Sequence, residues 1–383
     1  ENSTSSKSSK SSKSGKNSNS SETGRNRTTG RNNRKNLALA AAFAIVLGAG
    51  GAAATTAAMA DPADGKSSDG NAAGRGQGPR EVPATRYAKV ADLDPPSGFG
   101  PLTVLEGPAF GPDGKLYFVD LTAPAGGPKI LKFDVRTKAV TPVHRDADSG
   151  FSSLQFSPAD GKIYATDFKN GKIDRLNPDG SGFTTVFSGP VEGRTMVPDD
   201  LAFDKAGNMY VADYHGSPWD PTGRIVRFDA DGTHPTVLRG GLSAPNGISF
   251  NADYSALWVG EYSTGREALF TLAPDGKSVV ESRVAMTANI GGHGFDSNAV
   301  DAAGNVYQVV IGTGKILVWN DHGDLIGTIM VPDERGWEPL VSNLVIKPGT
   351  TDGYITVGGK DGGYIYTFRA FAPGTPQSNG GGA

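Results

Sequence analysis

Residues Pro198 to Phe203 read Pro-Asp-Asp-Leu-Ala-Phe, and a turn at Ala206-Gly207 and the alternating stretch 208–213, Asn-Met-Tyr-Val-Ala-Asp, follow them. Short apolar runs bounded by Gly and Asp are typical of β-strands joined by tight turns. The same order recurs along the chain. The segments that align with 199–203 are 106–110, 152–156, 246–250, 296–300 and 342–346, and the six first residues are spaced by 46, 47, 47, 50 and 46 positions. A period of about 40–50 residues made of short strands is the sequence form of a propeller, so we predict an all-β, six-bladed β-propeller.

The propeller is expected to span residues 86–371. The strand-like segment around Arg86–Val90 precedes the first repeat, and it can complete the blade that contains Tyr364–Phe371. Pairing the two ends of the chain in this way would remove open sheet edges, so the ring can close without a disulfide.

Composition excludes several classes of protein. The chain has 383 residues, no Cys and a net charge of −3, with 54 Gly and 25 Pro. Residues 1–60 carry a charge of +7, which leaves −10 for the rest of the chain. An acidic body is a poor partner for nucleic acid, since phosphate contacts need clustered Lys and Arg. The absence of Cys excludes thiol nucleophiles and Cys-ligated zinc.

The N-terminal region divides into three parts before the propeller. Residues 1–36 are rich in Ser and Lys, and we expect a disordered basic tail. Residues 37–60 are uncharged and end in Ala-Met-Ala, which predicts a signal peptide and a secreted protein that starts at Asp61. A membrane anchor that keeps the protein at the cell surface is the alternative. Residues 61–85 are expected to form a linker, and residues 372–383 a flexible C-terminal tail.

The first residue of each repeat is polar, although the residues after it are mostly apolar. In chain order these residues are Glu106, Ser152, Asp199, Asn246, Asp296 and Ser342. In a propeller the innermost strand of each blade lines the central channel, so these side chains are expected to converge at its mouth. Three carboxylates there would repel one another, and a divalent cation removes that repulsion. Oxygen ligands without His or Cys favour Ca²⁺, Mg²⁺ or Mn²⁺.

The motifs around these residues resemble the inner-strand motifs of the gluconolactonase family, which includes regucalcin-like proteins and bacterial lactonases. The motifs are Glu106-Gly-Pro-Ala-Phe110, Pro198-Asp-Asp200, Ala244-Pro-Asn-Gly-Ile248 and Phe295-Asp-Ser297. The Asp-Asp and Asp-Ser pairs are closest to the bacterial lactonase branch. The resemblance implies that Glu106, Asn246 and Asp296 ligate a catalytic metal, with Asp199 as a fourth ligand.

Together, these predictions indicate a secreted, metal-dependent hydrolase of lactones. One divalent ion, with Ca²⁺ preferred over Mg²⁺, Mn²⁺ or Zn²⁺, would polarise the carbonyl group. Asp199 or Asp296 would activate the attacking water, Asp200 and Ser297 would orient the metal ligands, and Ser297 is itself a candidate ligand. His293 is a candidate proton shuttle, as is His215.

The alternative is a non-catalytic propeller that binds a carbohydrate or a protein and holds a structural Ca²⁺. In either case we expect a monomer that contacts no nucleic acid and, after signal cleavage, no membrane. For the predicted hydrolase, the binding partner is a small lactone or ester substrate. No Gly-x-Ser-x-Gly motif is present, which argues against a serine esterase.

Overall fold

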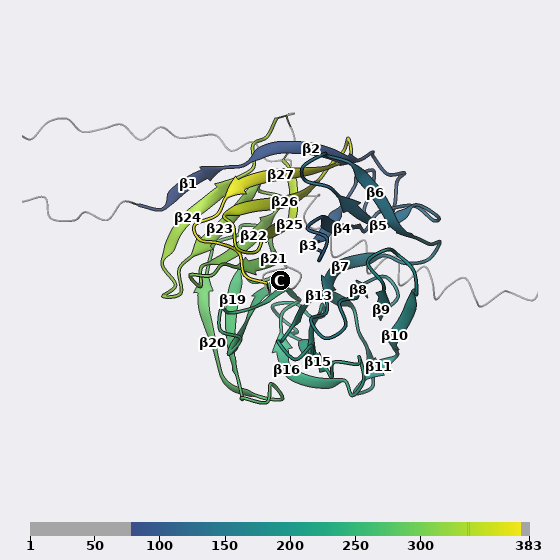
Figure 1. The fold of residues 1–383 in the computed structure, drawn as a ribbon. Coiled ribbons are helices and arrows are strands. Elements are labelled where there is room, and N and C mark those ends of the chain that lie inside the picture. The colour runs from purple at the N-terminus through teal and green to yellow at the C-terminus, as the bar shows by residue number, and fades with distance from the viewer. Residues whose placement is uncertain (1–77, 335, 337, 377–383) are drawn as a thin grey trace, which may run out of the picture.

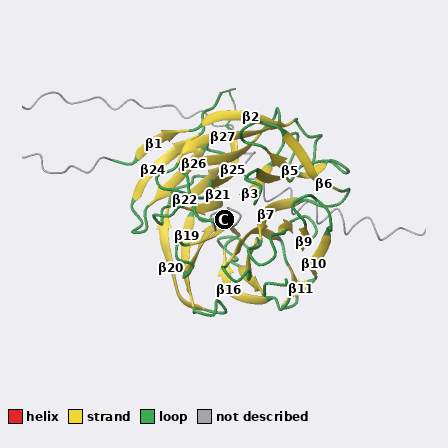
Figure 2. Cartoon of the chain, in the orientation of Figure 1, coloured by secondary structure: helices red, strands yellow, loops and turns green. Residues whose placement is uncertain are grey.

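The computed structural model describes residues 78–334, 336 and 338–376. In this part of the chain the backbone forms only strands and loops (Figure 2). It accordingly contains no helix with the length and apolar character that would be needed to cross a membrane. The predicted basic tail at 1–36 and the predicted signal peptide at 37–60 lie outside the described residues.

The strands form six sheets arranged as blades around a central axis, which confirms the predicted six-bladed β-propeller (Figure 1). Blades 1 to 3 consist of β3 (Leu105–Phe110), β4 (Leu116–Asp120), β5 (Pro128–Phe133) and β6 (Val140–Arg145); β7 (Phe151–Phe156), β8 (Ile163–Asp167), β9 (Lys172–Leu176) and β10 (Thr184–Ser188); and β13 (Pro198–Phe203), β14 (Met209–Asp213), β15 (Gly223–Phe228) and β16 (Thr236–Leu242). Blades 4 to 6 consist of β17 (Pro245–Phe250), β18 (Ala256–Glu261), β19 (Arg266–Leu272) and β20 (Val279–Thr287); β21 (Gly294–Val300), β22 (Val306–Ile311), β23 (Lys315–Trp319) and β24 (Leu325–Met330); and β25 (Leu340–Ile346), β26 (Asp352–Gly358) and β27 (Gly363–Arg369). A small hairpin of β11 (Pro190–Val191) and β12 (Arg194–Thr195) links blades 2 and 3.

The ring is closed by the N-terminal part of the chain. Strand β2 (Thr85–Ala91) pairs antiparallel with β27 and supplies the outer strand of blade 6, as the sequence predicts. Strand β1 (Arg80–Pro83) adds to blade 5 by pairing parallel with β24. Strands β1 and β2 therefore follow one another along the outside of blades 5 and 6 in Figure 1. The innermost strands contact one another all round, including β25 with β3.

The predicted limits of the propeller, 86 and 371, need correction at both ends. The linker was expected to reach residue 85, but β1 begins at Arg80 and is tied to blade 5. At the other end, Gly374 forms β-bridges with Asp301 and Pro348, so residues up to 374 pack against blades 5 and 6 rather than forming a free tail. These two pairings consist of backbone hydrogen bonds, which any residue except proline can form, so no side-chain pattern in the sequence indicates them.

The hydrophobic core lies between adjacent blades. A Tyr on the second strand of one blade packs edge-on against the Phe that ends the innermost strand of the next. The pairs are Tyr117–Phe156, Tyr164–Phe203 and Tyr210–Phe250, with ring centroids 5.0, 5.3 and 5.2 Å apart. Each pair contributes about 0.5–1.5 kcal/mol beyond the area that it buries. The repeat thus specifies the interface between blades as well as the blade itself.

Every innermost strand contains a register shift relative to its neighbour near its first polar residue. The shifts lie at 106–109, 151–153, 198–201, 245–248, 295–298 and 341–343. A β-bulge of this kind bends a strand and redirects its side chains, and bulges are common next to active sites. In blade 4 the bulge requires glycine, because a Cβ on Gly247 would lie 2.6 Å from the Asn298 backbone nitrogen of the next blade.

Candidate functional site

The bulges bring the predicted site residues together at the channel. Glu106, Asp199, Asn246 and Asp296 occupy equivalent positions in β3, β13, β17 and β21, and all four are buried. Asp200 and Ser297 follow in the same bulges and are also buried. The repeat alignment made from the sequence is therefore correct at each of these positions.

Asn246 connects carboxylates of different blades. Its Nδ2 donates a hydrogen bond to Asp199 Oδ2 at 2.9 Å, and its side chain also stabilises the charged form of Asp296. Asn343 Nδ2 lies 3.4 Å from Asp200 Oδ1 and stabilises the charged form of Glu106 as well. Two amides therefore hold four carboxylates in place, and neither amide carries a charge that could neutralise them.

Burial raises the pKa of every carboxylate in this group, and repulsion by neighbouring carboxylates adds to the rise for Glu106, Asp199 and Asp296. Burial is the main cause for Glu106, and the charges of Asp296, Asp200 and Asp199 add to it. For Asp296 the pKa is raised by burial and then by Asp199 and Asp200. The pKa of Asp199 is raised by burial and by Asp200. For Asp200 burial raises the pKa to about 6, and the neighbouring Ser297 and Asn343 side chains oppose that rise. Binding of a positive charge would stabilise such a site, because it offsets the repulsion between the buried carboxylates.

Several oxygen atoms of the site are buried and have no hydrogen-bond partner in the described chain. They are Asn246 Oδ1, Asp200 Oδ2 and Asp296 Oδ2. A buried acceptor without a donor is costly, and unpaired carboxylate and amide oxygens are the ligands of hard divalent cations. The donor set thus fits the predicted ion. Over the same residues, no group of three or more His, Asp or Glu side chains alone is placed to hold a metal.

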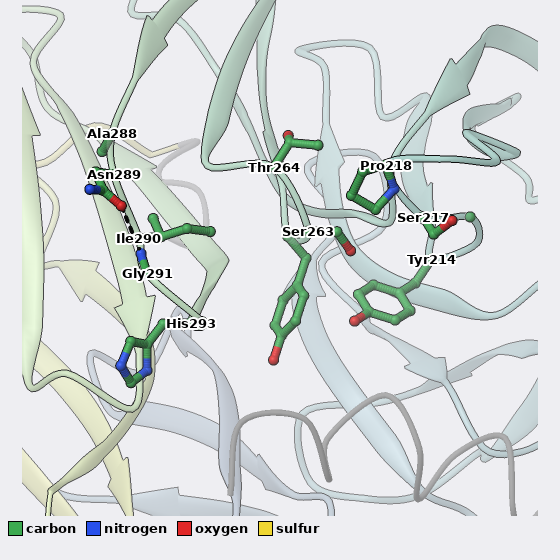
Figure 3. A pocket seen from close by; sticks show the side chains of 13 residues that line it. Tyr214, Ser217, Pro218, Ser263, Thr264, Ala288, Asn289, Ile290, Gly291 and His293 are labelled. Atoms are coloured by element: carbon green, nitrogen blue, oxygen red, sulfur yellow. Dashed lines mark hydrogen bonds between the residues drawn. The ribbon is translucent and has the colours of Figure 1, made fainter. Parts of the chain in front are cut away.

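A cavity of about 560 Å³ opens beside the carboxylates. Tyr214, Ser217 and Pro218 line one side, and Ala288, Asn289, Ile290 and His293 line the other (Figure 3). Tyr262 also lines the cavity, and the charges of Asp296 and Asp199 raise the pKa values of Tyr262 and Tyr214, although burial is the larger cause. The carboxylates are therefore close enough to act on two residues of the cavity wall, although none of them lines the cavity itself, and the cavity is large enough for a small molecule.

The two histidines considered in the sequence have different surroundings. His293 lines the cavity, and its Nδ1 is buried without a hydrogen-bond partner among the described residues. His215 Nδ1 instead lies 2.8 Å from Asp213 Oδ1, a carboxylate that also binds Arg224. His293 accordingly stays a candidate for proton transfer, whereas His215 belongs to a structural ion-pair network.

None of Arg194, Arg224 and Arg266 lines the cavity. Arg224 is buried and donates to Asp213 Oδ2 at 2.6 Å and to the Val191 carbonyl at 2.8 Å. Arg194 also reaches Asp213, at 3.3 Å. The loops over the cavity contribute uncharged walls instead of a cationic clamp.

Sequence reasoning missed residues that only the repeat alignment could have revealed. Tyr214 and Tyr262 each directly follow the acid that ends the second strand, and Leu121 and Phe168 occupy the equivalent positions in blades 1 and 2. This position therefore forms the rim of the channel. Gln308 was missed as well, and its Nε2 donates to the Asp296 and Ser297 carbonyls at 2.8 and 3.3 Å, which holds the blade 5 bulge.

This chain is similar to known proteins both by a family model and by direct sequence comparison. Residues 104–341 match the model described as the SMP-30/Gluconolactonase/LRE-like region. A relative named lactonase drp35 from Staphylococcus haemolyticus is 30% identical over 288 residues, which cover 70% of this chain and 84% of the relative. The lactonase drp35 of Staphylococcus aureus strain N315 is 27% identical over 287 residues, with the same shares covered.

Solved structures share the fold. A gluconolactonase from Xanthomonas campestris superposes with a TM-score of 0.58 at 19% identity, and the match covers 75% of this chain and 97% of that chain. A calcium-binding protein, regucalcin, from Agrobacterium tumefaciens superposes with a TM-score of 0.59 at 14% identity, covering 78% and 99%. With the family model spanning most of the propeller and the site residues at equivalent positions of the blades, the chain belongs to the SMP-30/gluconolactonase/LRE-like family.

Proposed function

We propose that this protein hydrolyses lactones at the mouth of its channel, with one divalent cation as cofactor. The observation that carries the proposal is the group of four buried carboxylates near a 560 Å³ cavity, in which Asp200, Asp296 and the neighbouring Asn246 amide each have an unpaired oxygen. The 30% identity to a lactonase supports the same reaction class. Glu106, Asn246 and Asp296 would hold the ion, with Asp199 in contact with it or one water away, and Ca²⁺ suits these oxygen ligands best. When bound, the cation supplies Lewis-acid polarisation of the carbonyl oxygen and neutralises the carboxylates.

The residues of the chain account for the proton transfers. A water molecule forms a bond to the carbonyl carbon, and a carboxylate takes its proton. The ring C–O bond then breaks, the electron pair leaves with the ring oxygen, and that oxygen receives the proton to give a hydroxy acid. Asp199 is the preferred base and Asp296 the alternative. At 9% exposure Asp199 is the most accessible of the four carboxylates, so water reaches it most easily. Asp200 and Ser297 keep the neighbouring oxygens oriented, and His293 can pass the proton between the cavity and solvent.

The test is a panel of lactones, aryl esters and phosphotriesters, assayed after chelation and again with Ca²⁺, Mg²⁺, Mn²⁺ or Zn²⁺ added back. We expect lactone hydrolysis that disappears with chelation and returns with Ca²⁺. Activity that survives complete metal removal would exclude the metal-dependent mechanism. Inactivity on the whole panel would favour a binding propeller instead.

The assignment of the base is tested by Asp199→Asn. If Asp199 is the base, this variant keeps its metal affinity while kcat falls roughly 10²–10⁴-fold. If Asp199 is only a ligand, rate and affinity fall together and recover together with excess metal. A variant with wild-type rate and affinity would transfer the role to Asp296.

Secretion is a separate proposal, and it rests on residues 37–60, which lie outside the described part. We propose cleavage after Ala60. N-terminal sequencing of exported material should begin at Asp61. An intact chain recovered with membranes would identify the segment as an anchor.

A further inference from the structure

The hydroxyl group of Tyr262 is an unused donor in the cavity wall. Tyr262 directly follows β18, lines the 560 Å³ cavity and is buried. Its Oη has no hydrogen-bond partner in the part of the chain that the structure describes. A buried O–H without an acceptor costs about 1–3 kcal/mol, so an unpaired hydroxyl in a ligand cavity points to an acceptor on the ligand.

The ring of Tyr262 is held in one orientation by its surroundings. The backbone is fixed on both sides, since Tyr262 N donates to the Ala244 carbonyl at 2.9 Å and Phe295 N donates to the Tyr262 carbonyl at 3.2 Å. The ring packs edge-on against Tyr214 with centroids 5.6 Å apart. Gly294 leaves room for it, because a Cβ at that position would lie 2.5 Å from the Tyr262 ring. The hydroxyl is therefore positioned before any ligand arrives.

The charges around Tyr262 define what its hydroxyl can do. Burial raises the pKa of the phenol well above its ordinary value, and the carboxylates Asp296, Asp199 and Glu106 raise it further. The group therefore stays protonated at neutral pH and acts as a donor.

We propose that the Tyr262 hydroxyl donates a hydrogen bond to the carbonyl oxygen of the bound lactone, which makes Tyr262 a further catalytic residue. This inference rests on the proposed lactone hydrolysis. As water forms its bond to the carbonyl carbon, the π electrons of the C=O bond move to the oxygen, and the hydrogen bond strengthens with the growing negative charge. Tyr262 keeps its proton throughout, since the carboxylate base takes the proton from water and the ring oxygen receives it.

The chain offers a matched pair of variants. Y262F removes only the hydroxyl group and retains the ring that packs against Tyr214. Y210F is the control, because the Tyr210 hydroxyl is bonded to the Gly276 carbonyl at 3.0 Å and its pKa responds to Asp204 and Arg227 instead of to the site carboxylates. We expect Y262F to lower kcat about 10²-fold, the usual loss for one donor to a developing oxyanion, to raise KM by no more than about tenfold and to leave Ca²⁺ affinity unchanged. Y210F should lower the Tm and leave kcat unchanged. Equal kcat values for Y262F and wild type would overturn the proposal, as would a loss that Y210F shares.

A binding measurement separates this inference from the hydrolase proposal. δ-Valerolactam has a carbonyl oxygen that accepts the same hydrogen bond, but its amide bond resists hydrolysis. In calorimetric titrations of the Ca²⁺-loaded proteins we expect wild type to bind the lactam about tenfold more tightly than Y262F. Wild-type protein that binds the lactam in this way without hydrolysing any lactone would contradict only the hydrolase proposal. Equal affinity of the two proteins, or no binding by either, would contradict the role of Tyr262.

Discussion

Each blade from 1 to 4 ends its second strand with a buried acid, and these acids contrast with those of the channel. We call Asp120, Asp167, Asp213 and Glu261 the strand-end carboxylates, and Glu106, Asp199, Asp200 and Asp296 the channel carboxylates. Strand-end oxygens accept backbone N–H groups: Asp167 from Gly150 at 3.1 Å, Asp213 from Val197 at 2.7 Å and Glu261 from Ser243 at 2.8 Å. Channel oxygens have side-chain amides and hydroxyls as donors, and some have no donor among the described residues.

The difference separates two roles that residue type and burial alone do not distinguish. A carboxylate that accepts a backbone N–H from a residue just before the innermost strand of its own blade fixes the start of that strand, so it contributes to folding. A carboxylate with unpaired oxygens beside other carboxylates destabilises the fold until a cation binds, so it contributes to function. Hydrogen-bond satisfaction therefore identifies the site within a protein that buries many acids.

Asp213→Asn should give the largest effect on stability. Asp213 accepts hydrogen bonds from Arg224 and Val197, and the variant leaves the Arg224 guanidinium buried without its counter-charge. Breaking such a pair costs about 3–5 kcal/mol in the free energy of unfolding. Urea denaturation measures it, with Asp92→Asn, which removes the exposed pair to Lys89, as a control expected to leave stability nearly unchanged. A small change for Asp213→Asn would remove the distinction between the two groups.

Asp296→Asn should act in the opposite direction. With metal chelated, the variant relieves repulsion among the channel carboxylates, and the free energy of unfolding should rise on the order of 1 kcal/mol. Saturating Ca²⁺ should stabilise wild type more than the variant, because binding to the folded state adds to stability. Lactone hydrolysis should fall by at least about 10²-fold. Destabilisation of the chelated protein would place Asp296 among the structural acids.

Glu267 tests the comparison outside the channel, since it is fully buried and half satisfied. Oε1 accepts from Asn298 at 2.8 Å, and Oε2 has no partner in the described chain. Burial raises the pKa of Glu267 well above its ordinary value, and the charge of Glu261 adds to that rise. Above about pH 4.3 the unfolded state loses this proton while the folded state keeps it, so wild-type stability falls as pH rises by up to about 1.4 kcal/mol per unit. E267Q does not titrate, and it should gain relative to wild type between about pH 5 and 7. Parallel stability–pH curves for the two proteins would show that Glu267 is ionised in the fold.

Ser342→Ala should have the smallest effect. Ser342 occupies the same bulge position as the channel carboxylates, yet its hydroxyl donates to the Leu105 carbonyl and lies 3.1 Å from Thr356 Oγ1. The loss of one neutral hydrogen bond costs about 1 kcal/mol, and activity should stay within about twofold of wild type. A large loss of activity would show that Ser342 belongs to the functional site and is not only a structural residue.

The repeat made most of the fold predictable. Polar first residues, Asp-Gly turns and alternating strands recur at a nearly constant period, so blade number, ring closure and the convergence of Glu106, Asn246 and Asp296 follow from spacing. The small strand β1 and the docking of Gly374 could not be predicted, because they depend on backbone hydrogen bonds that any sequence can form.

The sequence by itself determined the six-bladed ring and the acids that line it, because the period places one residue per blade at the same height. Only the tertiary structure decided which acids are satisfied, since the donors to Asp199 and Asp213 come from other parts of the chain. It also decided that Tyr262, rather than an arginine, lines the cavity. Those contacts depend on the relative positions of loops from different blades, which the repeat pattern of the sequence does not specify.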